Sequence, residues 1–156
     1  MAKIKLIKSS FEEDGNSYAF IETKYGIFMG NTKLHEEDKD IQSDFVGCHI
    51  AEYKARIKYE KEKLIELKKK NKILKSLVID MERLNGYEKN NLEARFVRKQ
   101  YYLSNETIQN QQEKIKVLKD NLLYTIQNYR QEKENFDKKI IELREKRNKK
   151  QEATEE

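Results

Sequence analysis

The chain has 156 residues, of which 37% are hydrophobic and 39% are charged. Ordinary globular domains are about 45–50% apolar and about 25% charged, so this composition argues against a large compact core. Proline is absent, which favours long uninterrupted helices. No apolar run approaches the roughly 20 residues of a membrane span, and no signal peptide is apparent. The single cysteine excludes an internal disulfide, and these features together predict a cytoplasmic protein that does not associate with membranes.

Charge is unevenly distributed along the chain, whose formal net charge is +5. Residues 11–44 contain nine acidic residues and three lysines. Residues 54–75 contain ten basic residues and three glutamates. An acidic segment is therefore followed by a basic one. The positive charge of the basic segment suggests that it meets negative charge elsewhere in the chain or on a partner.

Three short segments near the N-terminus have the pattern of β-strands. They are KIKLIK (3–8), YAFIETK (18–24) and IFMGNTKL (27–34). Asp14-Gly15-Asn16 and Tyr25-Gly26 are turn signals, and Gly26 suits the positive φ of a tight hairpin. We predict a small antiparallel β-meander with an acidic loop over residues 1–42, with its apolar face covered by the start of the following helix.

A first long helix is predicted from about residue 44 to residue 84. Ser43 or Asp44 can cap its start, and Asn85-Gly86 is a stop signal. Inward positions recur at alternating steps of four and three, as in a coiled coil. They are Val46, Ile50, Tyr53, Ile57, Glu60, Leu64, Leu67, Asn71, Leu74, Val78 and Met81. Asn71, at an a position, either fixes the register of two helices or lies near the surface of a loose hairpin.

A second helix is predicted from about residue 88 to residue 150. Its inward positions recur at every seventh residue: Tyr101, Ile108, Ile115, Leu122, Tyr129, Phe136 and Leu143. The companion positions four residues later are mostly polar, with Ile126 and Ile140 as exceptions; the polar ones are Asn105, Gln112, Lys119 and Lys133. A break in the LSNET segment (103–107), giving three helices, is the alternative. The predicted class is α+β, mostly α: a small N-terminal antiparallel β-meander, then a long antiparallel coiled-coil helical hairpin (43–150) and a disordered tail (151–156).

The two predicted helices differ in length. At ~1.5 Å per residue they are about 60 Å and about 90 Å long, so roughly twenty residues of the second must project past the first. A helix pair with polar seam positions buries little apolar surface. We therefore predict a homodimer formed by the projecting segment, with Tyr129, Phe136, Ile140 and Leu143 as its dimerisation residues.

Both histidines and the only cysteine fall near the predicted helix start. His35, Asp38, Cys48 and His49 lack the two closely spaced pairs that structural zinc sites usually show. Cys48 is expected to pack as a small apolar residue, and His49 to lie on the helix surface. The five glycines are expected at turns or in the first helical turn, and no phosphate-binding loop or nucleophile arrangement is apparent. We predict a non-enzymatic protein with no metal, no cofactor and no catalytic residue.

The positions that flank the seam of the first helix are basic between residues 54 and 75. They are Lys54, Arg56, Lys61, Lys63, Lys68, Lys70 and Lys75, and they form the predicted partner-binding set. Such positions normally pair with opposite charges on the facing helix, but residues 97–118 carry four basic and two acidic residues. The lysines either stay solvated or meet the chain's own acidic segment, an acidic protein surface or a nucleic-acid backbone.

The segments ETKYGIFMGNTKLHEEDKD (22–40) and SDFVGCHIAEYKARIK (43–58) resemble small uncharacterised proteins encoded by phages and prophages of Gram-positive bacteria. The shared features are the run from Gly26 to Gly30, the His-acidic stretch 35–40 and the helix start GCHIAEYKARIK. The rest of the chain is similar only as coiled coil. The resemblance implies a phage origin and a role in host takeover or defence evasion, with no catalytic residues to transfer.

Two function classes are open. The first is a phage-encoded protein-interaction module that binds and inhibits a bacterial host or defence protein, such as a CRISPR nuclease. The second is a nucleic-acid-binding accessory protein that uses the basic first helix. A structural or scaffolding role in a virion ranks third. The protein binder is preferred because the acidic segment would repel a phosphate backbone and no recognised nucleic-acid module is present. If the lysines are merely solvated, Phe20, Tyr25 and Phe28 of the meander form the alternative binding surface.

Overall fold

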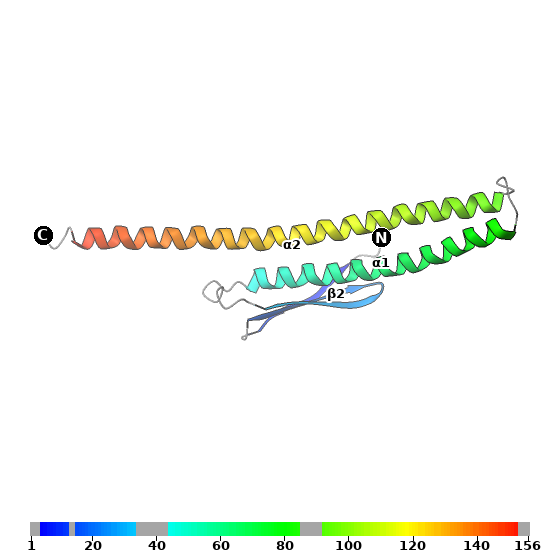
Figure 1. The fold of residues 1–156 in the computed structure, drawn as a ribbon. Helices are drawn as coiled ribbons and strands as arrows, with labels where there is room; N and C mark the ends of the chain where they lie inside the picture. The colour runs from blue at the N-terminus through cyan, green and yellow to red at the C-terminus, as the bar shows by residue number, and fades with distance from the viewer. Residues whose placement is uncertain (1–3, 13–14, 34–43, 85–91, 153–156) are drawn as a thin grey trace.

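The computed structural model describes residues 4–12, 15–33, 44–84 and 92–152. Three strands come first: β1 (Lys5–Phe11), β2 (Asn16–Thr23) and β3 (Gly26–Lys33). Two long helices follow: α1 (Asp44–Leu84) and α2 (Leu92–Glu152). The predicted class, a small antiparallel sheet followed by a helical hairpin, is confirmed (Figure 1). Within the described residues no helix is long and apolar enough to cross a membrane.

The sheet is a meander with the strand order β1-β2-β3, in which both neighbouring pairs are antiparallel. The β2–β3 turn closes at Gly26, which adopts a φ of 114° that glycine reaches without strain. The hydroxyl of Thr23 donates to the carbonyl of Gly26 and accepts from the amide of Tyr25. The turn predicted at Tyr25-Gly26 is therefore confirmed.

The first part of α1 covers one face of the sheet, as predicted. Ser17, Ala19 and Ile21 alternate along β2 and are buried beneath the helix. On the helix side, Ala51 and Ala55 are fully buried, one turn apart. Small side chains on both surfaces allow the helix and the sheet to approach closely, which compensates for the scarcity of large apolar residues.

Gly30 lies in the middle of β3, where α1 crosses the strand. A Cβ atom at this position would overlap the carbonyl oxygen of Ala51 and the amide nitrogen of Ala55. The expectation that every glycine sits at a turn or in the first helical turn is therefore wrong for Gly30. A strand glycine here serves the close approach of another backbone.

The aromatic residues of the meander do not form one exposed surface. Phe28 faces α1 and packs against Tyr59, with 5.6 Å between ring centroids. Tyr25 also contacts Tyr59, at 6.0 Å. Phe20 lies on the opposite face of the sheet, because its neighbours in β2 are the residues that point toward the helix. The alternative binding surface made of Phe20, Tyr25 and Phe28 is therefore divided between two faces.

α2 packs on the side of α1 that faces away from the sheet, so that α1 is the middle of three layers (Figure 1). Ile57 of α1 and Ile115 of α2 are buried where the helices meet. The predicted antiparallel hairpin is confirmed, and α2 continues without interruption through 103–107. Thr107 fits within the helix because its hydroxyl donates to the Leu103 carbonyl at 2.8 Å.

Two companion positions on the inner face of α2 differ from the prediction. After Ile108 and Ile115 the inward residue lies three positions later rather than four. Gln111 is buried whereas Gln112 is exposed, and Leu118 is half-buried whereas Lys119 is exposed. The physical reason is the partner of Gln111, which hydrogen-bonds to Glu60 across the hairpin.

α2 has 61 residues and α1 has 41, a difference of about 30 Å at ~1.5 Å per residue. Figure 1 shows the C-terminal part of α2 extending past the start of α1 and past the sheet. The projection predicted from the sequence is confirmed. α2 continues to Glu152, two residues beyond the predicted end; the rest of the predicted tail and the predicted start of this helix at 88–91 lie outside the described residues.

Candidate functional site

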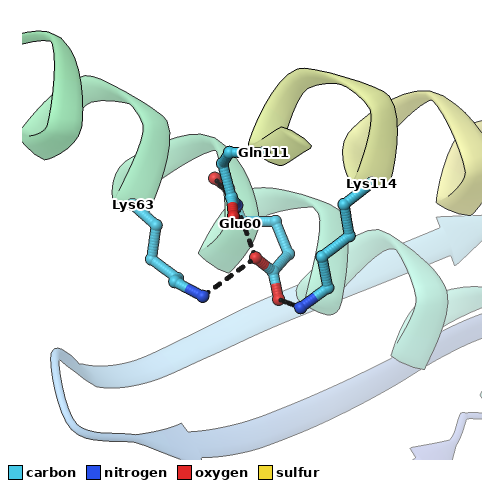
Figure 2. A network of polar contacts seen from close by, with 4 residues as sticks. All are labelled: Glu60, Lys63, Gln111 and Lys114. Carbon is cyan, nitrogen blue, oxygen red and sulfur yellow. Dashed lines mark hydrogen bonds and ion pairs between the residues drawn. The ribbon is translucent and has the colours of Figure 1, made fainter. Parts of the chain in front are cut away.

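A network of polar contacts joins the two helices at Glu60 (Figure 2). Glu60 occupies an inward position of α1, and its side chain is 1% exposed. The Gln111 amide donates to the Glu60 carboxylate at 2.5 Å and to the Glu60 backbone carbonyl at 2.9 Å. The ammonium groups of Lys114 and Lys63 lie 2.8 Å and 3.4 Å from the two carboxylate oxygens. The Glu60 carboxylate thus makes polar contacts with side chains of both helices.

The surroundings of Glu60 keep it ionised. Burial opposes ionisation, but the hydrogen bonds from Lys114 and Gln111 and the positive charges of Lys114 and Lys63 together outweigh it. They hold the pKa of this carboxyl below its ordinary value. Such enclosed ion networks contribute little net stability compared with an apolar core, and their best-attested use is to fix register. The network specifies which residues of α1 and α2 lie opposite each other.

Asn71 and Asn105 form a second polar contact across the hairpin. The Asn71 side-chain amide donates to the Asn105 side-chain oxygen at 3.0 Å, and both residues are half-buried. A shift of the hairpin by one heptad would separate these two amides. The contact supports the interpretation in which Asn71 sets the register.

The structure divides the seven predicted partner-binding residues into two sets on opposite sides of the hairpin. Three of them pair with glutamates of α1 itself. These pairs are Arg56 with Glu52 at 2.6 Å, Lys63 with Glu60 at 3.4 Å, and Lys70 with Glu66 at 3.2 Å. The signal for them is present in the sequence, because each glutamate precedes its partner by three or four residues, the spacing of ion pairs within a helix.

The other four residues, Lys54, Lys61, Lys68 and Lys75, form what we call the lysine row. They recur at every seventh residue, at intervals of about 10.5 Å along α1. Within the described part of the chain, no carboxylate pairs with any of them. Lys54 is half-buried; burial lowers its pKa, and the positive charge of Lys58 lowers it further. The lysine row therefore carries positive charge that the hairpin does not balance.

A hollow of about 380 Å³ lies beside the lysine row, between the two helices. Its lining residues are Lys61, Leu64, Gln112, Ile115, Lys116, Lys119 and Asp120. Leu64 and Ile115 supply apolar surface, and three lysines outnumber the single aspartate. We call the hollow together with the lysine row the lysine groove. Lys61 is the member of the row that lines the hollow, and the charge and apolar lining suit a ligand that is acidic and partly apolar.

Cys48 and His49, the two candidate metal ligands within the described ranges, are adjacent near the start of α1. His49 is exposed, as predicted, and its ring lies between Phe45 and Tyr53 at centroid distances of 6.1 Å and 4.9 Å. Cys48 is half-buried with a free thiol. No group of three or more His, Cys, Asp or Glu residues in the described ranges could hold a metal ion. His35 and Asp38 belong to the segment 34–43, which lies outside those ranges, as do six of the nine acidic residues of the segment 11–44.

The four predicted dimerisation residues lie at the edge of the projecting part of α2 or within it. Tyr129 and Ile140 are half-buried. Phe136 and Leu143 are 58% and 65% exposed. The seven-residue series that faces α1 along the hairpin thus continues beyond it, where α1 no longer covers it.

Comparisons of the chain with protein-family models, with curated proteins and with solved structures find no match. The resemblance to phage and prophage proteins stays a prediction.

Proposed function

We propose that this protein is a non-enzymatic interaction module, encoded by a phage, that binds and inhibits a bacterial host or defence protein in the host cytoplasm. The observation that carries the proposal is the lysine row. Four lysines at equal spacing lie on one side of the hairpin, and none pairs with a carboxylate among the described residues. Positive charge placed in this way speeds association with an acidic surface and discriminates against other partners.

The way in which α1 is held also supports a binding role. The sheet packs on one side of α1 and α2 on another, while Glu60 and Asn71 make polar contacts that align the helices. The backbone of α1, which carries the lysine row, is therefore held in place by its neighbours before a partner binds. This reduces the conformational entropy lost on binding. At the Glu60 network, the ionisable side chains of Glu60, Lys63 and Lys114 pair with one another, which is typical of a structural network.

A nucleic-acid-binding accessory protein is the second candidate, because a phosphate backbone would engage the same lysines. Two observations favour a protein partner. Nine acidic residues in 11–44 precede the basic helix. On the other side of the hairpin, Arg56, Lys63 and Lys70 each pair with a glutamate of α1, so the flanking lysines without such a pair all lie on one side of the seam.

We further propose that the protein acts as a homodimer joined through the projecting part of α2. The exposed side chains of Phe136 and Leu143 support this, because each continues a series that is otherwise covered by a helix. A dimer would present two lysine grooves at a fixed separation. That arrangement suits a partner with repeated or symmetric acidic surfaces.

The proposed function is tested by capture and inhibition. Full-length protein is immobilised and exposed to a lysate of a Gram-positive host, with and without nuclease treatment. The captured protein is then purified, and its own activity is titrated with the free module. We expect capture that survives nuclease, and inhibition that saturates at a stoichiometric ratio. Capture lost on nuclease treatment would favour the nucleic-acid alternative, and capture without inhibition would rule out an inhibitor.

A further inference from the structure

We infer that the lysine groove is the docking site for an acidic amphipathic helix of the partner, with carboxylates that recur at every seventh residue. This inference rests on the proposed function and narrows it to one surface and one kind of partner segment. Of the seven basic residues that flank the seam, only the four of the lysine row are expected to contact the partner.

The spacing of the lysine row matches another helix. Residues seven apart on an α-helix are about 10.5 Å apart along its axis. A helix laid alongside α1 therefore offers one carboxylate to each lysine, as flanking charges do in a coiled coil. Phosphates along a strand of duplex DNA recur at about 3.4 Å. There would be roughly three phosphates for each lysine of the row, so most phosphates would have no lysine opposite them.

Exposed apolar side chains lie on the two helices near residues of the groove, and an amphipathic helix would cover them. Ile65 lies one turn from both Lys61 and Lys68 on α1, and it is 46% exposed. On α2, Leu123 lies two turns from Lys116 and is 57% exposed. A phosphate backbone would leave these side chains in water, whereas an amphipathic helix would bury them between its flanking carboxylates.

A second copy of this chain does not fit the charge of the groove. The exposed projecting segment, residues 130–148, carries seven basic and five acidic residues. Its approach to the lysine row would bring positive charge toward positive charge. The projecting segment is therefore assigned to dimerisation and the groove to a different protein.

Residues 34–43, which carry four of the nine acidic residues of the segment 11–44, are too short to reach Lys68 or Lys75. They join Lys33 of β3 to Asp44 of α1, so ten residues anchored at both ends extend no more than about 18 Å. Lys68 and Lys75 lie 24 and 31 residues beyond Asp44, or about 36 Å and about 46 Å along the helix. The acidic occupant of the full row must therefore come from another molecule.

The test uses a defined probe, a fluorescent 28-residue peptide with leucine at its a and d positions and glutamate at its flanking positions. A matched peptide carries glutamine in place of glutamate. The full-length protein is compared with a row variant, Lys61→Gln with Lys68→Gln and Lys75→Gln. The control variant is Lys69→Gln with Lys99→Gln and Lys138→Gln, which removes the same charge from exposed lysines outside the groove. Circular dichroism checks that each variant is folded.

We expect saturable one-to-one binding of the acidic peptide and weaker binding of the glutamine peptide. The row variant should lose roughly tenfold in affinity, since three exposed ion pairs are each worth about 0.2–1 kcal/mol. The control variant should stay within about twofold. Absence of peptide binding, or equal loss in both variants, would overturn the inference.

Two outcomes separate the inference from the proposed function. If the row variant still captures and inhibits the lysate partner as well as the original protein, the groove is not the docking site, although the proposed function stands. If instead the acidic peptide does not bind, but 21-nucleotide single-stranded or duplex DNA binds and the row variant loses that affinity, both fall in favour of nucleic-acid binding. A steep dependence on salt would accompany the second outcome.

Discussion

Gln111 on α2 donates two hydrogen bonds to Glu60 on α1, one to the carboxylate at 2.5 Å and one to the backbone carbonyl at 2.9 Å. The pair links a side chain of one helix to both the side chain and the main chain of the other. It explains why Gln111 rather than Gln112 faces inward. Fixing the alignment of the hairpin here also fixes where Lys61 lies relative to Lys116 and Lys119.

The first prediction concerns the Glu60 carboxylate. Glu60→Gln should lower the free energy of unfolding by about 1–2 kcal/mol, because it removes the charged acceptor of a buried hydrogen-bonded network. Glu60→Leu should cost more, because it leaves Gln111, Lys63 and Lys114 in place without the side-chain acceptor that they share. Urea unfolding followed by circular dichroism, at one protein concentration, measures both. Glu62→Gln, at an exposed position of α1, is the control and should change stability by less than about 0.5 kcal/mol. A Glu60→Leu protein as stable as the original would contradict the argument.

The second prediction concerns pH. The folded-state pKa of Glu60 lies below its ordinary value of 4.5, so the folded protein binds fewer protons than the unfolded chain in that range. The stability contributed by this carboxylate is therefore present above about pH 4.5 and is lost as the pH falls through the folded-state pKa. Urea midpoints between pH 3 and pH 7 should fall on acidification, and less steeply for Glu60→Gln. Equal slopes for the two proteins would show that Glu60 is not responsible.

The third prediction concerns Gly30. Gly30→Ala should destabilise the protein by about 2 kcal/mol, because the added methyl group meets backbone atoms of Ala51 and Ala55 that cannot rotate away. The melting temperature should fall by about 5 °C or more. Asn31→Ala, at the neighbouring exposed position, should have little effect. A Gly30→Ala protein as stable as the original would mean that α1 does not press on β3.

Local sequence patterns predicted the helices, the strands and their order. Contacts between elements determined the details that those patterns did not predict. The spacing of Ile57, Leu64 and Asn71 was enough to place one face of α1 against α2. A seven-residue repeat does not say whether the companion lies three or four residues later, so Gln111 was identified only through Glu60. Likewise, the strand pattern around Gly30 carries no information about how closely a helix crosses it. These features depend on a second element, which the local sequence does not describe.

The candidate site was predicted as a set of residues but not as a geometry. All seven flanking basic residues were identifiable from the heptad positions. Their division into paired and unpaired sets depends in part on glutamates three or four residues away, which the sequence contains. The hollow between Lys61 and Lys119 depends on the alignment of two helices, and therefore on contacts between residues about fifty apart in the chain.

The last prediction concerns the projecting part of α2. Phe136→Ser with Leu143→Ser should convert a dimer into a monomer, because these exposed side chains continue the seam of α2 where α1 no longer covers it. Light scattering should give twice the chain mass of 18.8 kDa for the original protein and the single mass for the variant. Leu84→Ser with Leu92→Ser, at the opposite end of the hairpin and 83% and 79% exposed, removes two apolar side chains as a matched control and should leave the dimer intact. Truncation after Asn128 should also give a monomer, as Phe136→Ser with Leu143→Ser does, without lowering the helicity of the remaining chain. If the original protein has the monomer mass even at high concentration, or if only the control variant dissociates, the projecting segment does not join two copies, and the surface carried by Phe136 and Leu143 must serve another contact.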